Sequence, residues 1–321
     1  MTDSPASLNG RAALICEELA RDTARWRLAV SRLECGARVI DFGVDAEGGL
    51  DAGLRLAEIC MGGLGRAALA ATSAELGSGV AVHVATDHPL VACMASQYAG
   101  WQIAGEKFFA MGSGPMRALA KREPLFESIS VDEASDAAVG VLESGKLPTD
   151  DVCRDVAAKC GVDPQHLTLC VARTASLAGT LQVVARSVET ALHKLHELGF
   201  DIAKVHNGYG AAPLPPVAKD DLAAIGRTND AILYGGHATL WVRCDDAEIS
   251  DVGPRVPSNA SADHGRPFAE IFARYGGDFY KIDPLLFSPA MVTFNNLASG
   301  RSFRFGHMKP DVLAESFRVE S

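Results

Sequence analysis

The stretch from Ala178 to Leu198 constrains the fold more than any other part of this 321-residue chain. Its apolar residues recur every three or four positions, which predicts one long amphipathic helix with a buried stripe. The stripe consists of Leu181, Val184, Val188, Leu192 and Leu195. A polar row on another face consists of Gln182, Arg186, Glu189 and His193. Because side chains three and four residues apart share one row of a helix, Arg186 and Glu189 are expected to lie side by side.

Spacing alone leaves two interpretations of Arg186 and Glu189 open. One is a solvated ion pair, which contributes only about 0.3–0.5 kcal/mol. The other is a functional pair, and the segment before the helix favours it. Residues 173–180 combine small side chains and hydroxyls, and they directly follow the apolar run from Leu167 to Ala172. A strand that passes through such a turn into a helix presents backbone N–H groups and the positive end of the helix dipole to a ligand.

Composition restricts the class of protein and its partners. With 48% hydrophobic and 22% charged residues, the chain is expected to fold throughout. The net charge of −10 argues against nucleic-acid binding, which needs a basic face. No apolar run reaches the roughly 18 to 20 residues of a membrane span, and residues 1–10 lack the basic and apolar regions expected of a signal peptide. Eight cysteines without a CxxC pair predict reduced thiols in a cytoplasmic protein with no membrane partner.

The order of elements indicates an α+β protein with an internal duplication. We expect a hairpin between residues 28 and 44, strands at 80–85 and 167–172, and helices at 50–61, 90–104 and 150–160. Three pairs of segments correspond across the chain: 84–86 with 171–174, 112–115 with 208–213, and 136–139 with 230–233. They predict two related α+β lobes, at residues 1–145 and 146–321 with approximate boundaries and an exchange of segments left open, and a substrate cleft between them.

Several familiar chemistries lack their motifs. The histidines form no HExxH pattern and bring no third ligand at a recognisable spacing, so no metal site is predicted. The chain also lacks the GxSxG elbow of serine hydrolases, the P-loop and the dinucleotide fingerprint. What remains is a carboxylate beside an arginine, near turns of small residues. Such a pair is suited to positioning a water molecule against a carbon that is already electrophilic.

Longer motifs give a specific resemblance. They are DHP at 87–89, ASQYAGW at 95–101, FFAMGSGP at 108–115, QVVARSVETALHK at 182–194, GRTNDAILYGG at 226–236 and FYKIDP at 279–284. Together they resemble the methenyltetrahydromethanopterin cyclohydrolase family, and most of all its bacterial form, which serves formaldehyde oxidation. The resemblance runs from about residue 8 to Phe317. It implies reversible hydrolysis of the methenyl bridge of N5,N10-methenyltetrahydromethanopterin to the N5-formyl compound, with no metal or other cofactor, in a homotrimer.

The same resemblance implies the roles of the pair. Glu189 would position and deprotonate the attacking water, and it would return the proton to N10 as the bridge opens. Arg186 would hold the carboxylate and favour its ionised form. Arginine is unsuited to act as the base, because its guanidinium stays protonated.

Further candidates for contact with the pterin come from the turns, and for each a purely structural role remains open. They are Lys107, Ser113, Gly114, Arg173, Thr174, Ser176, Asn207, Gly208, Tyr280, Lys281 and Asp283. Two other functions compete with the cyclohydrolase. A non-catalytic pterin carrier would not need Arg186 and Glu189, and a metal-dependent amidohydrolase would need a ligand cluster.

Overall fold

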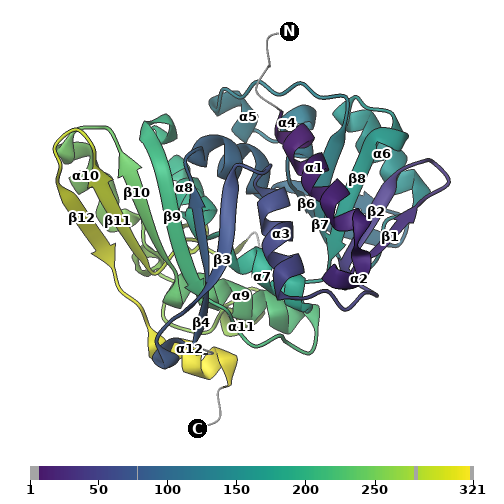
Figure 1. Cartoon of the computed structure of the whole chain (residues 1–321). Coiled ribbons are helices and arrows are strands. Elements are labelled where there is room, and N and C mark those ends of the chain that lie inside the picture. Colours follow the sequence, from purple (N-terminus) through teal and green to yellow (C-terminus); the bar gives the residue numbers. More distant parts are fainter. Residues whose placement is uncertain (1–6, 78, 278–280, 319–321) are drawn as a thin grey trace. The chain divides into compact units, whose positions relative to one another are not determined.

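The computed structural model describes residues 7–77, 79–277 and 281–318. The chain divides into two compact units, and each is built from two separate stretches of sequence. The first unit contains the chain up to Arg66 together with Val91–Gln182, and the second contains Ala67–Leu90 together with the chain from Val183 onward. Both units combine helices with a mixed sheet, which confirms the α+β class and the two lobes (Figure 1). The units differ from the expected halves in two stretches, because residues 67–90 are part of the second unit and residues 146–182 are part of the first.

The first unit is built on a six-stranded sheet. In spatial order its strands are β1 (Ala29–Arg32), β2 (Arg38–Gly43), β8 (Leu167–Ala172), β7 (Ala138–Glu143), β6 (Phe108–Ser113) and β5 (Trp101–Gly105). The three central strands, β2, β8 and β7, are parallel, and the pairs at both edges are antiparallel. The predicted hairpin at 28–44 and the strand at 167–172 are therefore confirmed.

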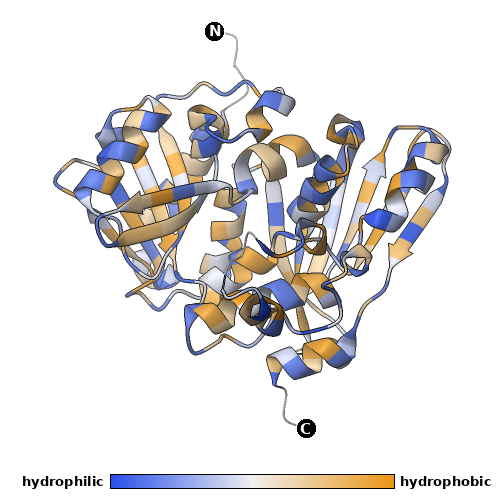
Figure 2. Cartoon of the chain, turned by 180° about the vertical axis from the view of Figure 1, so that it is seen from behind, coloured by the Kyte–Doolittle hydropathy of each residue, from blue (hydrophilic) through white to orange (hydrophobic). Residues whose placement is uncertain are grey.

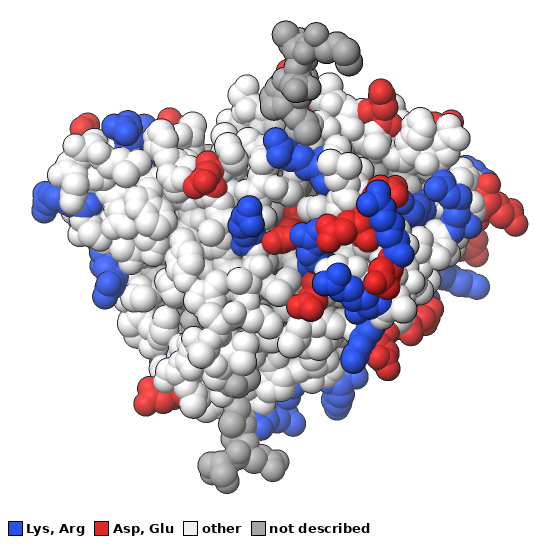
Figure 3. All heavy atoms as spheres, in the orientation of Figure 1, with Lys and Arg blue, Asp and Glu red and all other residues white. Residues whose placement is uncertain are grey.

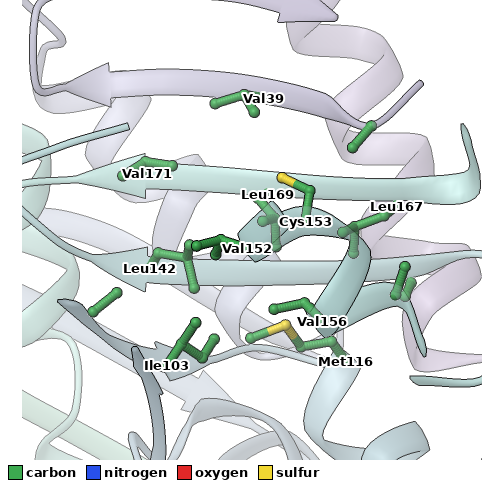
Figure 4. Close-up of a cluster of buried hydrophobic side chains, with 14 of the residues drawn as sticks. Val39, Ile103, Met116, Leu142, Val152, Cys153, Val156, Leu167, Leu169 and Val171 are labelled. Carbon is green, nitrogen blue, oxygen red and sulfur yellow. The ribbon is translucent and has the colours of Figure 1, made fainter. Parts of the chain in front are cut away.

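Helices cover both faces of this sheet. They are α1 (Leu8–Arg21), α2 (Thr23–Trp26), α3 (Leu50–Cys60), α4 (Met116–Ala120), α5 (Leu125–Ser128) and α6 (Asp150–Cys160). On one face Leu142 and Leu169 pack with Val156 of α6 (Figure 4). On the other face Val141 and Cys170 pack in the same cluster as residues of α1 and α3. The central strands are buried on both sides, as parallel strands usually are.

The expected helix at 90–104 is wrong in its second half. A π-helical segment, η2 (Leu90–Gln97), is followed by a short loop and then by β5. Within β5 buried Trp101 and Ile103 alternate with exposed Gln102 and Ala104, which is the period of a strand. The helices expected at 50–61 and 150–160 are confirmed as α3 and α6.

The second unit has its own six-stranded sheet. Its strands in spatial order are β12 (Ser302–Gly306), β11 (Met291–Asn296), β10 (His237–Val242), β9 (Val205–Pro213), β4 (Val80–Thr86) and β3 (Gly65–Ala71). Only β10 and β11 are parallel among the pairs with a determined register. The helices of this unit are α8 (Ser187–Glu197), α9 (Asp221–Gly235), α10 (Asp246–Val252), α11 (Phe268–Arg274) and α12 (Pro310–Phe317).

The two faces of the second sheet differ. Leu240, Val292 and Phe294 point to the inner face and are fully buried. Their neighbours Thr239 and Thr293 point the other way and are partly exposed. The helix α8 packs on the inner face against β9, and it is seen behind β9 in Figure 1 and in front of the strands in Figure 2.

The duplication is visible in the strand pairing, although not in every segment expected. The runs β5-β6-β7-β8 and β4-β9-β10-β11 are both joined in the order antiparallel, antiparallel, parallel. This makes β6 equivalent to β9 and agrees with the match of 112–115 with 208–213. The other two matches do not fit this pairing. Residues 136–139 lead into β7 whereas 230–233 lie inside α9, and β4 takes the place of β5 rather than that of β8.

Candidate active site

The polar row begins at a break between two helices. Instead of one helix from Ala178 to Leu198, the structure has α7 (Leu177–Val184) and α8, and Arg186 is the N-cap residue of α8. The amide of Arg186 donates to the carbonyl of Val183 at 3.2 Å, one residue short of the α-helical register. The hydroxyl of Thr190 donates to the carbonyls of Arg186 (3.0 Å) and Ser187 (3.2 Å). The amide of Thr190 also donates to the carbonyl of Arg186 at 2.8 Å, so regular helix bonding resumes directly after the break.

Arg186 and Glu189 are both buried, with exposed fractions of 5% and 4%. This excludes the solvated ion pair that spacing alone allowed. Glu189 lies in the first turn of α8, where the helix dipole favours a negative charge. Burial of a carboxylate and a guanidinium is unfavourable unless other groups compensate both charges. The start of α8 therefore keeps two charged side chains buried, although removing them from water is energetically costly.

Two glycines of β9 allow α8 to approach the sheet so closely. A Cβ atom on Gly208 would lie 2.6 Å from Cγ1 of Val188, and one on Gly210 would lie 2.3 Å from Oγ of Ser187. Any side chain at either position would push the first turn of α8 away. Gly208, a predicted pterin contact, is thus explained by packing beneath α8.

Asn207 points to the opposite face of the sheet. Successive residues of a strand alternate, and Gly208 faces α8. The Asn207 side chain instead donates from Nδ2 to Oδ1 of Asp87 at 2.6 Å. The structure therefore does not place this amide on the α8 side, where Glu189 lies.

In the first unit, β8 ends at Ala172 and passes through a short turn into α7, as predicted. Ser176 occupies the cap position: its hydroxyl donates to the carbonyl of Arg173 (2.8 Å) and accepts from the amide of Gly179 (3.0 Å). Thr174 is buried, and its carbonyl accepts from the Thr180 hydroxyl at 2.9 Å. The hydroxyl of Ser176 is thus occupied by the helix end that it stabilises.

Lys107 lies at the turn between β5 and β6, in a left-handed conformation with φ 58°. It lines a surface hollow of about 420 Å³ with Phe109, Ser144 and Lys146. The Lys146 ammonium donates to the carbonyl of Lys107 at 3.1 Å. This hollow lies where β7 ends, and the carboxyl ends of parallel strands are the usual ligand-binding edge of such sheets.

Ser113 and Gly114 lie at the other end of β6 from Lys107, roughly 20 Å away along an extended strand. Ser113 is fully buried, and its hydroxyl donates to the carbonyl of Val141 at 3.3 Å. Gly114 adopts φ 89°, and a Cβ atom there would lie 3.1 Å from the amide nitrogen of Val141. The structure does not bring these two residues together with Lys107.

The remaining candidates lie near the C-terminal part of the second unit. Tyr280 is outside the described residues, and Lys281 is exposed. Asp283 is used structurally: it accepts from the amide of Leu285 (3.0 Å) and from the hydroxyl of Ser261 (2.6 Å). The buried ammonium of Lys194, in α8, donates to the carbonyl of Leu285. Burial lowers the pKa of Lys194 to about 8, against the opposing effect of the Asp283 carboxylate.

One residue pair was missed by sequence reasoning. The carboxylate of Glu143, the last residue of β7, accepts from Nε2 of fully buried Gln182 at 3.0 Å. Glu143 ends an apolar strand, at the edge of the sheet where the carboxyl ends of the parallel strands lie. Its position after an apolar run could therefore have indicated a candidate site residue from the sequence.

Among the residues that the structure describes, no group of three or more His, Cys, Asp or Glu side chains is arranged to hold a metal ion. None of the helices in the described part of the chain is both long and apolar enough to cross a membrane.

A carboxylate and a guanidinium buried together at the start of one helix, in an α+β chain of two units, are the kind of charged pair that enzymes place at active sites. Comparison with known proteins identifies the family. The family model described as Cyclohydrolase (MCH) matches residues 7–317, and the chain belongs to this family.

Named relatives cover nearly the whole chain. The methenyltetrahydromethanopterin cyclohydrolase of Rhodopirellula baltica is 51% identical over 88% of this chain and 86% of its own length. The enzyme of the same name from Methylobacillus flagellatus is 48% identical over 97% of this chain and 95% of its own. That of Methanococcoides burtonii is 42% identical over 98% and 99%. The chain is thus similar over its length to cyclohydrolases of both bacterial and methanogen sources.

Proposed function

We propose that this enzyme opens the methenyl bridge of N5,N10-methenyltetrahydromethanopterin with water and gives the N5-formyl compound, reversibly. The observation that carries the proposal is the burial of Glu189, at 4% exposure, in the first turn of α8 beside equally buried Arg186. The family and the printed names of its relatives supply the substrate.

The substrate requires little activation. Its bridge carbon lies between two nitrogens of a delocalised cation, so it is electrophilic before the enzyme acts. Glu189 orients a water molecule and accepts one of its protons as the water oxygen bonds to the bridge carbon. The bond from that carbon to N10 then breaks, and Glu189 returns the proton to N10. The carboxylate also attracts the cationic substrate, and its buried position strengthens both effects.

Arg186 keeps the carboxylate ionised and fixed. A guanidinium stays protonated throughout the accessible pH range, so it provides a constant positive charge near Glu189. Its position at the N-cap of α8 fixes its backbone relative to the first turn that carries Glu189. Lys107, Arg173 and Lys281 remain the proposed contacts for the pterin and its tail.

Three further features belong to the proposal. The reaction uses no metal ion or prosthetic group, so a chelator leaves it unchanged. The protein is a cytoplasmic homotrimer, and its free cysteines are consistent with a reducing compartment: the buried sulfurs of Cys16 and Cys170 lie 3.7 Å apart without a bond. The reaction serves one-carbon metabolism and formaldehyde oxidation, as the names of relatives from Methylobacillus and Methylobacterium suggest.

The test follows the decay of methenyl-pterin absorbance with purified protein in the presence of EDTA. Glu189→Gln keeps the shape of the side chain but removes the base, so we expect a loss of about 10² or more in kcat. The matched control is Glu197→Gln in the same helix, where the carboxylate is exposed. Full activity in Glu189→Gln would remove Glu189 from the mechanism. Binding without turnover by the wild type would favour the carrier.

A further inference from the structure

Lys194 is a buried charge that the proposed mechanism does not use. It lies in α8, the helix that carries Glu189, and only 1% of its surface is exposed. Lysine and arginine side chains usually reach water, as the blue spheres on the surface in Figure 3 illustrate. Burying an ammonium is unfavourable unless other groups compensate its charge, so a buried lysine is poor evidence for added stability. Its presence in α8 points instead to a specific contact.

The contact is made with residues 281–287, which we call the 281–287 segment. The Lys194 ammonium donates to the main-chain carbonyl of Leu285, in the 3₁₀ turn η8 (Pro284–Leu286). Asp283 caps this turn by accepting from the amide of Leu285 at 3.0 Å. Burial lowers the pKa of Lys194, and the negative charge of Asp283 opposes this effect. The carbonyl and the nearby carboxylate thus compensate the buried ammonium, and α8 is bonded to a distant part of the chain.

A separate network holds the 281–287 segment without help from α8. The Asp263 carboxylate accepts from the amide of Asp283 at 3.3 Å and from the hydroxyl of Tyr275 at 2.9 Å, and it pairs with Arg274 at 3.4 Å. The hydroxyl of Ser261 donates to Asp283 at 2.6 Å. Loss of the Lys194 ammonium would therefore free the segment from α8 while leaving it attached to the rest of the second unit.

The 281–287 segment carries a proposed substrate contact. Lys281 is exposed, and it is followed by Ile282, which is 2% exposed and anchors the main chain in the second unit. The position of Lys281 is therefore set by the packing of the segment. The bond from Lys194 to Leu285 links this segment to α8, so it fixes where Lys281 lies relative to the helix of Glu189.

We propose that Lys194 is a positioning residue for substrate binding, which holds the 281–287 segment against α8 so that Lys281 meets the substrate. The inference rests on the proposed function, which gives Lys281 and Glu189 their roles. Lys194 is buried, so it acts through the segment and does not touch the substrate itself. Its loss weakens binding in the ground state and in the transition state alike, and the chemical step at Glu189 is left intact.

Steady-state kinetics of Lys194→Met test this role. Methionine keeps the length of the side chain but removes the ammonium. We expect KM for the methenyl-pterin to rise about tenfold, which corresponds to one weakened charge-assisted contact, with kcat within about twofold of the wild type. The matched control is Lys204→Met, which removes an ammonium that pairs with Glu248 at 2.6 Å elsewhere in the second unit, and its KM should not change. A folded Lys194→Met protein with the KM of the wild type would overturn the proposal.

A double-mutant cycle identifies the residue through which Lys194 acts. Lys281→Ala alone should raise KM. In the Lys281→Ala background, Lys194→Met should change KM by less than about twofold, because the contact that it positions is already lost. A lysine that only stabilises the fold would have the same effect in both backgrounds, and that result would contradict the proposal.

Hydrogen exchange tests the attachment of the segment without any substrate. The amides of Leu285 and Leu286 should exchange about tenfold faster in Lys194→Met than in the wild type or in Lys204→Met, because one side of the segment is released. Unchanged exchange would refute the positioning role even if the enzyme is active. A wild type that does not turn over the methenyl-pterin would instead refute the proposed function, and the role of Lys194 in substrate binding with it, whatever the exchange rates are.

Discussion

The sheets of the two units are alike in size but differ in how they are buried. In the first unit Val141 and Leu142 are adjacent in β7, and both are fully buried because helices cover both faces. In the second unit Val292 and Thr293 are adjacent in β11, and only Val292 is fully buried. The difference follows from connectivity: parallel strands need crossover helices, which come to cover a sheet on both sides, whereas hairpins leave a face open.

The two sheets also differ in which of their faces and edges are covered by helices. In the first unit helices cover both faces of the sheet, and Lys107, Arg173 and Glu143 lie at the edge formed by the carboxyl ends of its parallel strands. In the second unit one face of the sheet supports α8 and its buried charges, whereas residues on the other face, such as Thr239 and Thr293, are partly exposed.

The largest expected effect tests the burial pattern itself. Val141→Ala, Leu142→Ala and Val292→Ala each remove buried methyl groups and leave a cavity, so we expect the free energy of unfolding to fall by about 2 kcal/mol or more, up to ~5 for Leu142. Thr293→Ala, at a partly exposed position of β11, should change it by less than ~0.5 kcal/mol. Urea unfolding followed by circular dichroism gives all four values. An effect of Thr293→Ala as large as that of Val292→Ala would show that the second sheet is buried on both faces after all.

An intermediate effect on the free energy of unfolding is expected from the buried aspartates. Those of the two units differ in the number of hydrogen bonds that their carboxylates accept. The Asp41 carboxylate accepts four backbone amides, from Gly43 to Ala46. Asp230 accepts from one amide, of Phe268 (2.7 Å), and from the Ser316 hydroxyl (2.6 Å). Burial is the main cause that raises the pKa of Asp230 to about 7, although these two bonds lower it.

Asp230 should make the second unit less stable as pH rises. Between pH 3.8 and about 7 the folded protein retains a proton on Asp230 that the unfolded chain has released. The folded state binds more protons in this window, so the free energy of unfolding falls with rising pH, by up to ~1.4 kcal/mol per pH unit. Asp230→Asn should flatten that slope, as measured by denaturant unfolding at several pH values. An unchanged slope in Asp230→Asn would assign it to other groups.

Local sequence patterns predicted much of the fold. The strand at 167–172 and the helix at 150–160 were found from period and turn residues, because each is short, uniform and bounded by clear signals. The assignment of residues 67–90 to the second unit could not be found this way. It depends on the pairing of β4 with β9, in which Ala85 lies opposite Tyr209 from a distant part of the chain.

The sequence predicted some features of the candidate site and not others, again because local patterns show only local contacts. The Arg186 and Glu189 pair was visible because one helical turn joins its members, whereas their burial depends on Gly208 and Gly210 in another element. The break before Arg186 was invisible because the apolar stripe continues in phase across it. Glycine turns were weaker guides: Ser113 and Gly114 proved to be buried among backbone groups of β7.

The smallest expected effect concerns the charged surface of the first unit, where ion pairs are exposed to water. Arg55 of α3 pairs with Glu58 at 2.8 Å and with Glu18 of α1. Glu18 is 54% exposed, and such pairs are screened by water and salt, so Arg55→Gln should lower the free energy of unfolding by about 0.2–1 kcal/mol, and by less in 1 M salt. Urea unfolding at low and high salt gives both values. A loss well above ~1 kcal/mol that persists in 1 M salt would show that this pair is shielded from water, as Arg186 and Glu189 are by burial, and that the two units do not differ in this respect.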